Sequence, residues 1–315
     1  MEDRFQSGIG TKADFSIQRG GMNVLLIDVD SKIPNLALMK ISAWHKIQGD
    51  VVGFDTRTPD KVYISCIFTR NRAQAKGIAS FYDGVDIDIG GSGINLKKQL
   101  PEEIEEIKPD YDLYPSQYSQ GYTTRGCIRK CPFCIVPEKE GIIREAQHPL
   151  VFHDPRFDTC MIMDNNLFAA PDYWQSEIFH WFTENKIKML SPQGWDIRLL
   201  TEGRAKCLKA VRHAGILHFA WDNIFDEPEV IKGIEILKRT GFDLRHKISF
   251  YVLAGFNSTI NDDLYRLRKL KSLGVQAFVM PYRKTKEINA LARWANRPWL
   301  FWSIDFKDYT RKAPA

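Results

Sequence analysis

Short, continuous apolar runs alternate with helix-length segments along most of this 315-residue chain, and that alternation constrains its fold more than any other feature. A continuous apolar run of about four to eight residues is typical of a buried parallel strand. The segments between the runs carry apolar residues at helical spacing, and the clearest begins after capping side chains and ends before a glycine. Strands that alternate with helices in this way indicate an α/β protein with parallel sheets.

Residues 22–112 hold the first group of runs and predict a small doubly wound, Rossmann-like domain. Strands are expected at 24–27, 51–54, 62–68 and 85–89, with a helix at 33–48. The last strand leads into Gly90-Gly91-Ser92-Gly93, whose backbone N–H groups can cradle a phosphate or a cofactor tail. The same glycines also suit a tight strand-to-helix turn. Residues 1–21 have no clear period and are interpreted as a flexible leader or an arm added for expression.

Residues 113–284 hold six further candidate strands, reached through a predicted surface helix and linker at 101–118. The strands are expected at 120–126, 159–163, 187–192, 216–220, 248–253 and 277–280, and the helices at 173–185, 202–214, 228–240 and 260–273. Polar residues directly follow five of these strands. Because loops at the carboxyl ends of parallel strands converge on one mouth, this repetition predicts a functional site there.

Three clustered cysteines follow the first of these six strands. Cys127, Cys131 and Cys134 form a C-x3-C-x2-C arrangement, and Phe133 precedes the third cysteine. Thiolates are the soft ligands that iron–sulfur clusters take. The three cysteines are therefore candidate ligands for an iron–sulfur cluster.

A zinc site is the main alternative for these cysteines. A structural zinc knuckle needs a fourth ligand, for which His148 or His153 is available, although such sites favour two separated cysteine pairs. The remaining cysteines lack motif spacing and are predicted to be packing residues: Cys66, Cys160 and Cys207. A disulfide framework is not expected, because the chain has only six cysteines for its length.

The cysteine motif with its aromatic residue resembles the signature of the radical S-adenosylmethionine (SAM) enzymes. The resemblance implies a partial (βα)6 barrel over residues 113–284 and a 4Fe–4S cluster on the three cysteines. It implies that SAM chelates the open iron through its amino and carboxylate groups. With an electron from a flavodoxin- or ferredoxin-type donor, SAM would split into methionine and a 5′-deoxyadenosyl radical that takes hydrogen from a substrate.

The resemblance also implies where SAM would bind. The amino group is expected at the turn Asp164-Asn165-Asn166, which replaces the usual Gly-Glu pair of the family. The candidates for the carboxylate and ribose are polar residues after the third and fourth strands: Gln193, Asp196, Arg198 and Asp222. Arg198 can pair bidentately with the carboxylate and Asp222 can accept from ribose, while a structural Asp196–Arg198 pair is the alternative.

Apolar residues complete the expected SAM contacts. The adenine is expected to pack on an aromatic of the cysteine motif and on the ends of the last two strands: Phe133, Leu253 and Met280. Residues 285–315, rich in Trp and Arg, are predicted to form a C-terminal cap that meets the substrate at the barrel mouth. The alternative for this segment is a helix packed on the barrel wall.

Residues 22–112 resemble the cobalamin-binding domain that precedes many radical SAM domains. The histidine-ligating form carries D-x-H-x-x-G after its first strand, whereas this chain has Asp28, Asp30 in the place of histidine, and Ile33 in the place of glycine. The domain is expected to bind cobalamin without a histidine ligand, to bind part of the substrate, or to bind nothing. A cobalamin-dependent radical SAM methyltransferase is therefore one alternative function. A zinc-stabilised nucleic-acid-binding module is the alternative from another class.

Composition limits the cellular location and the substrate classes that are expected. The sequence has no run of about 18 apolar residues and no basic-then-apolar leader, so neither a membrane span nor export is expected and the cytoplasm is predicted. The net charge of +5 is compatible with an anionic substrate, and a nucleoside or nucleic acid is preferred on this charge and the mouth-side aromatics. No sequence motif identifies the substrate. The densest basic group is predicted to be the solvated face of a helix: Arg266, Arg268, Lys269 and Lys271.

Overall fold

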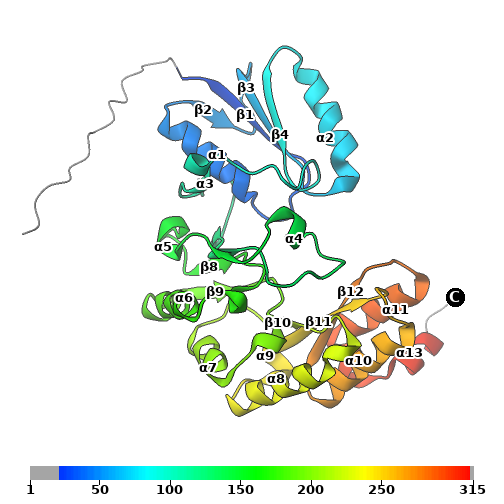
Figure 1. Ribbon diagram of the computed structural model, residues 1–315. Helices are drawn as coiled ribbons and strands as arrows, with labels where there is room; N and C mark the ends of the chain where they lie inside the picture. Colours follow the sequence, from blue (N-terminus) through cyan, green and yellow to red (C-terminus); the bar gives the residue numbers. More distant parts are fainter. Residues whose placement is uncertain (1–20, 313–315) are drawn as a thin grey trace, which may run out of the picture.

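The computed structural model describes residues 21–312, so the predicted leader lies outside the described residues except for Gly21. The protein is an α/β protein in which parallel sheets alternate with helices, as the sequence predicts. Figure 1 shows a smaller sheet with its helices above a larger set of strands and helices. None of the helices in the described part of the chain has the length and apolarity needed to cross a bilayer.

The upper part is a four-stranded parallel sheet with helices on both faces (Figure 1). Its elements are β1 (Asn23–Asp28), α1 (Leu36–Ile47), β2 (Val51–Gly53), β3 (Lys61–Ser65), α2 (Arg72–Ala79), β4 (Asp86–Gly90) and α3 (Glu102–Glu105). The strand order is β2-β1-β3-β4. One face packs Val24 and Leu26 against α1 and α3, and the other packs Leu25 and Val62 against α2. The apolar runs thus mark the strands correctly.

Helix α1 begins three residues later than its apolar pattern predicts. Ile33 precedes Pro34, and a residue before proline is disfavoured in the helical region. Asn35 then caps the helix, because its side chain accepts a hydrogen bond from the backbone N–H of Leu38 at 3.2 Å. The helix therefore starts at Leu36.

The lower part contains six parallel strands in two hydrogen-bonded groups. The first group is β5 (Ser119–Gly121), β8 (Thr159–Ile162) and β9 (Lys188–Leu190), and the second is β10 (Leu217–Ala220), β11 (Ile248–Ala254) and β12 (Gln276–Pro281). Two isolated parallel bridges, Met189 with His213 and Trp195 with Phe219, join the neighbourhoods of β9 and β10. Within residues 21–312, β5 and β12 do not pair, and no closed barrel forms.

Helices cover one face of these strands and form the main core. They are α6 (Asp172–Glu184), α7 (Glu202–Ala210), α8 (Glu227–Arg239), α10 (Ile260–Ser272) and α11 (Lys286–Ala295). Helix α10 opens with a capping box in which Thr259 and Asp262 satisfy each other's backbone N–H groups. The predicted packing roles of Cys66 and Cys160 are confirmed, since both side chains are fully buried.

The first strand of the lower part is shorter than predicted. It ends at Gly121 rather than 126, and β6 (Thr124–Arg125) turns away to pair antiparallel with β7 (Arg144–Glu145). The buried carboxylate of Asp164 causes this turn. It accepts hydrogen bonds from the backbone N–H and hydroxyl of Thr123 and from the Thr124 hydroxyl. The β6–β7 ribbon closes the loop that carries the three cysteines.

The C-terminal helices pack along the outer helices. Helices α12 (Pro298–Ser303) and α13 (Phe306–Lys312) follow α11. Trp294 and Phe301 are fully buried in the main core, 5.2 Å apart between ring centroids. This is the wall packing named as the alternative for residues 285–315, and their meeting with substrate stays a prediction.

Side-chain contacts fasten the upper part to the lower part. The Gln120 amide donates to the carbonyl of Pro34 at 2.7 Å, and the Lys40 ammonium donates to the Gln147 side chain at 3.0 Å. Lys40 is almost fully buried, and burial lowers its pKa although Glu105 offsets part of this effect. The two parts are therefore joined by buried polar contacts as well as by the chain.

Candidate functional site

The three cysteines lie on one loop whose ends are pinned together. Gly126 has φ of +81°, and a Cβ there would lie 2.1 Å from the carbonyl oxygen of Ile142. The N–H of Cys127 donates to the carbonyl of Gly141 at 3.2 Å. Only glycine suits this close approach and this conformation, so Gly126 sets where the loop departs from β6.

The cysteine sulfurs are accessible thiols with hydrogen-bond donors beside them. Cys127 and Cys131 are half-buried and Cys134 is exposed, and none forms a disulfide. The Cys127 sulfur accepts from the N–H of Arg129 at 3.3 Å, and the Cys134 sulfur accepts from the N–H of Val136 at 3.4 Å. Hydrogen bonds of this kind stabilise thiolates that ligate iron–sulfur clusters.

The Cys131 thiol interacts electrostatically with the other two cysteines and with residues that follow β9 and β10. Burial raises the pKa of Cys131, and the charges of Cys134, Asp222 and Cys127 act in the same direction. Arg198 partly offsets the rise by favouring the thiolate. The loop therefore brings its cysteines within electrostatic reach of residues that follow β9 and β10.

Neither histidine named as a fourth zinc ligand joins the cysteines among the described residues. In residues 21–312, no three His, Cys, Asp or Glu side chains gather closely enough to hold one metal ion. His148 and His153 pack against Trp181 instead of meeting the cysteines.

Glu140 fastens the loop and was not foreseen from the sequence. This buried carboxylate accepts from the N–H of Gly126 at 3.3 Å and from the Asn165 amide at 3.1 Å. It also pairs with Arg125 at 3.3 Å. Burial acts to raise the pKa of Glu140, but Arg125, Lys139 and these donors outweigh it and hold the pKa below its ordinary value. Glu140 thus ties the cysteine loop to β6 and to the turn after β8.

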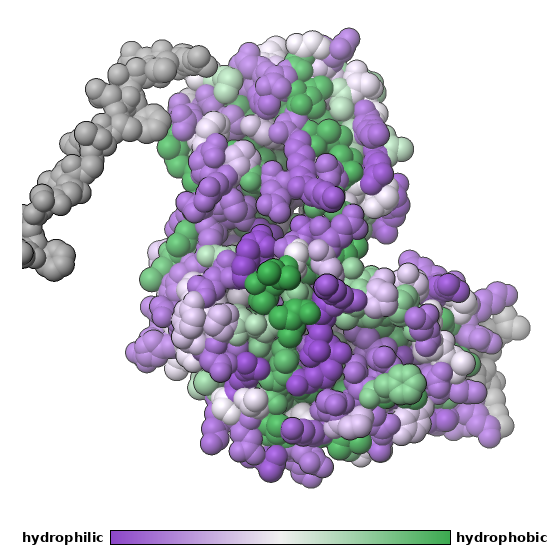
Figure 2. All heavy atoms as spheres, in the orientation of Figure 1, coloured by the Kyte–Doolittle hydropathy of each residue, from purple (hydrophilic) through white to green (hydrophobic). Residues whose placement is uncertain are grey.

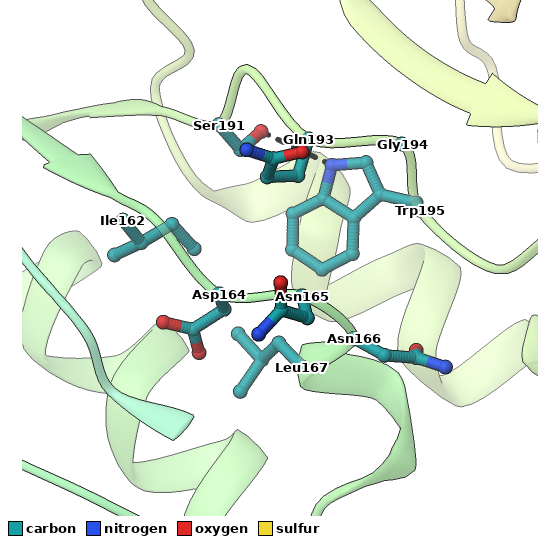
Figure 3. Close-up of a pocket in the computed structure, with 9 residues that line it drawn as sticks. All are labelled: Ile162, Asp164, Asn165, Asn166, Leu167, Ser191, Gln193, Gly194 and Trp195. Carbon is teal, nitrogen blue, oxygen red and sulfur yellow. Dashed lines mark hydrogen bonds between the residues drawn. The ribbon is translucent and has the colours of Figure 1, made fainter. Parts of the chain in front are cut away.

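The turn after β8 holds the predicted residues Asp164, Asn165 and Asn166, in three different environments (Figure 3). Asp164 is committed to Thr123 and Thr124, and burial raises its pKa. The Asn165 amide donates a hydrogen bond to the Glu140 carboxylate.

Asn166, whose side chain extends away from Asp164 in Figure 3, meets the cysteine loop. Its amide donates to the sulfur of Cys127 at 3.5 Å and to Asp196 at 3.4 Å. Its buried side-chain oxygen has no hydrogen-bond partner among the described residues. An unsatisfied buried acceptor at this place is suited to a ligand donor.

Asp196 is the centre of a charged network beside the cysteines. It accepts from the Arg198 guanidinium at 2.7 Å and from the Arg129 guanidinium at 2.9 Å. Arg198 also pairs with Asp226 at 3.1 Å. Burial acts to raise the pKa of Asp196, but the two arginines outweigh it and lower the pKa. The Asp196–Arg198 pair named as the alternative is therefore present, and Arg129 joins it to the cysteine loop.

The remaining predicted residues line the same end of the strands. Asp222 accepts from the N–H of Leu253 at 3.2 Å, and burial raises its pKa. Phe133 meets Phe256, the residue after Gly255 beyond β11, edge to face at 5.2 Å. Met280 is largely exposed at the end of β12. Gln193 lines a small hollow with the turn after β8, opposite Asn165 in Figure 3.

The surface around the loop is unusually apolar. Ile128, Ile135 and Ile142, all on the loop, are exposed large hydrophobic residues. Figure 2 shows apolar side chains gathered near the middle of this face, at the height of α4 (Val136–Lys139) in Figure 1. Single exposed apolar residues are ordinary, but a gathered patch marks a surface that another molecule covers.

The candidate cofactor-binding groups of the upper sheet are mostly engaged in contacts within the protein. Asp30, in the histidine place, accepts from the N–H groups of Ile67 at 2.7 Å and Phe68 at 3.0 Å. Gly91 and Gly93 lie against the backbone of residues 66–68, where any Cβ would come within 3.0 Å of it. The glycine turn is thus explained by close packing on the neighbouring loop.

Comparison with known proteins adds no assignment to this geometry. No protein-family model matches the chain, and no curated protein is significantly similar to it. The cysteine loop and the residues gathered around it are therefore the features that bear on function.

Proposed function

We propose that the protein is a radical SAM enzyme that carries a 4Fe–4S cluster on Cys127, Cys131 and Cys134. The observation that carries the proposal is the placement of the cysteine loop against polar residues that follow β8 and β9, Asn166 at the Cys127 sulfur and Asp196 at Arg129. Such a cluster would supply one electron to SAM and release a 5′-deoxyadenosyl radical for hydrogen abstraction. The protein's own residues would hold SAM, orient it and exclude water.

The geometry refines which residues would hold SAM. Asn166 contacts the cysteine loop and keeps a buried oxygen without a partner, and Asp196 lies beside it, so we assign the SAM amino group to this pair rather than to Asp164, which accepts from Thr123 and Thr124. Arg198 remains the candidate for the carboxylate and Asp222 for the ribose. The adenine would lie against Phe133, Leu253 and Met280, at the apolar side of the same strand ends.

The proposal includes the finer architecture. Six parallel strands follow one another in chain order from β5 to β12, with helices on one face and no closure. This order supports an open (βα)6 barrel of the radical SAM kind, with a Rossmann-like domain above it. A flavodoxin- or ferredoxin-type donor and a cytoplasmic setting belong to the same proposal.

Cluster assembly tests the proposal first. The purified protein is supplied anaerobically with iron and sulfide, and protein-bound iron and sulfide are then measured with the visible absorption of iron–thiolate bonds. We expect four irons and four sulfides per chain, as the proposed cluster requires, and their loss in Cys127→Ala. Cys207→Ala is the matched control, because Cys207 lies on α7 outside the motif. Bound zinc without sulfide would refute the proposal.

Cobalamin binding by the upper sheet stays a prediction. Asp30 and the glycine turn are engaged within the protein, so neither supplies a free ligand for a corrinoid. A cobalamin-dependent methyltransferase remains the alternative if the purified protein takes up added hydroxocobalamin. Absorption spectra after gel filtration measure that uptake directly.

A further inference from the structure

The sheet formed by β10, β11 and β12 has two very different faces. On one face Phe219, Phe250 and Val279 are fully buried beneath the helices. Side chains alternate along a strand, so the neighbouring residues point the other way. Those residues include His218 and Phe278, which belong to an aromatic group on the face opposite the helices.

Three aromatic rings on three adjacent strands form this group, which we call the aromatic face: His218, Tyr251 and Phe278. The His218 and Tyr251 rings are stacked, with centroids 4.4 Å apart and planes 5° apart. Phe278 meets Tyr251 edge to face at 5.7 Å. The Tyr251 hydroxyl donates to the carbonyl of Pro192 at 2.9 Å, so this ring is held at both ends.

The aromatic face is open where a parallel barrel is normally filled. Interior side chains of a closed barrel pack in layers and exclude solvent. Here Phe278 is 39% exposed, Met280 on the same face of β12 is 46% exposed, and Tyr282 beyond it is 48% exposed. The exposed Phe278 ring, held beside the stacked His218 and Tyr251 rings, gives a platform against which another planar ring can pack.

A polar atom beside the platform has no partner. The buried Nδ1 of His218 makes no hydrogen bond among the described residues. Burial lowers the pKa of His218, so its ring is neutral near pH 7 and can donate one hydrogen bond or accept one. A heteroaromatic ring offers such groups at its edge, whereas a hydrocarbon ring does not.

Free positive charge follows the platform along the chain. Arg283, Lys284 and Lys286 come directly after β12, and all three are exposed. None of the three forms an ion pair with an acidic side chain within the described part of the protein. Three unpaired cations next to stacked aromatics match the two halves of a nucleotide, the base and the phosphate.

We propose that the substrate is a nucleotide, free or within a polynucleotide, whose base stacks on the aromatic face and whose phosphate meets the basic loop at 283–286. The role of the nucleotide as a substrate rests on the radical SAM proposal. The binding of a nucleotide at this face does not depend on that proposal. Leu253 and Met280, which are assigned to the SAM adenine, follow Tyr251 and Phe278 by two residues on the same strands, so the nucleotide would lie beside SAM on this face.

Binding is tested by calorimetric titration of the protein as purified, without cluster or SAM. The probes are GMP, CMP and UMP, none of which contains the adenine of SAM, together with a short oligouridylate and ribose 5-phosphate. We expect at least one nucleotide or the oligonucleotide to bind saturably and far more tightly than ribose 5-phosphate. Tighter binding by the oligonucleotide would identify a polynucleotide substrate, and tighter binding by a monophosphate a free nucleotide.

Two variants test separately how the base and the phosphate contribute to binding. Phe278→Ala should weaken binding about tenfold, as loss of one stacking partner does, while Phe81→Ala, an exposed phenylalanine of the upper part, should not. Arg283→Gln with Lys284→Gln should weaken binding and flatten its salt dependence. Lys232→Gln with Lys238→Gln on α8 is the charge-matched control.

The proposal is overturned if no probe binds, if ribose 5-phosphate binds as tightly as the nucleotides, or if Phe278→Ala binds like the wild type. Thermal unfolding of each variant confirms that it is folded. Because these titrations need neither cluster nor SAM, their failure would leave the radical SAM proposal standing, and failure of cluster assembly would leave these results standing.

Discussion

Replacing Arg266 should destabilise the protein far more than replacing its helix neighbour Arg268. Arg266 is fully buried, and its guanidinium donates to the carbonyls of Trp221 at 2.6 Å and Leu253 at 2.8 Å and to Asp263 at 2.6 Å. Asp263 in turn accepts from the N–H of Gly255 at 3.0 Å. The pair therefore fastens the ends of β10 and β11 to helix α10, next to the candidate site.

The expected loss of unfolding free energy can be estimated from the groups that Arg266→Leu would leave without a partner. The Asp263 carboxylate would stay buried without its cation, and breaking a buried pair in this way costs about 3–5 kcal/mol. The two freed carbonyls act in the same direction. Arg268 pairs with Asp305 where the two side chains are 47% and 40% exposed, and exposed pairs contribute about 1 kcal/mol or less. We expect Arg266→Leu to lower the free energy of unfolding by about 4 kcal/mol and Arg268→Leu by less than about 1 kcal/mol.

Urea-induced unfolding, followed by tryptophan fluorescence, measures both variants. The double variant Arg266→Leu/Asp263→Leu should recover part of the loss, because it removes the uncompensated charge together with its partner. Equal effects of Arg266→Leu and Arg268→Leu would refute this reasoning, and so would a double variant less stable than Arg266→Leu alone.

Further predictions concern the cysteine loop. Gly126→Ala should abolish cluster assembly, because its Cβ would collide with the Ile142 carbonyl at an unfavourable φ. Gly141→Ala, with φ of +73° and no atom within 4 Å of its Cβ, should retain most of the iron, and equal loss in both variants would contradict this. The lowered pKa of Glu140 implies stability that is present above its unfolded-state pKa and lost as pH falls through the lower folded-state pKa. Glu140→Gln should therefore lose less unfolding free energy than the wild type between about pH 7 and pH 3, and an unchanged pH profile would contradict this role.

Local patterns predicted the strands and helices well because their causes are local. An apolar run marks a buried strand wherever it lies, and Pro34 and Asn35 together explain why α1 begins at Leu36. The end of the first lower strand was missed for a different reason. It depends on Asp164, about forty residues further along the chain, which draws Thr123 and Thr124 out of the strand.

Non-local contacts also explain the errors and omissions at the site. The prediction that Arg266 belongs to a solvated helix face is wrong, because the carbonyls of Trp221 and Leu253 bury it. Glu140 has no motif of its own, and its importance comes from donors on β6 and on the turn after β8. The cysteine motif could be recognised from the sequence because its three cysteines lie within eight residues of one another.

Formation of 5′-deoxyadenosine tests the central claim most directly. The anaerobically reconstituted protein is mixed with SAM and dithionite, and 5′-deoxyadenosine and methionine are quantified by chromatography. The account predicts that the wild type forms both products in equal amounts and that Cys127→Ala forms neither above background. A wild-type protein that holds a full cluster yet forms no more 5′-deoxyadenosine than Cys127→Ala would contradict it.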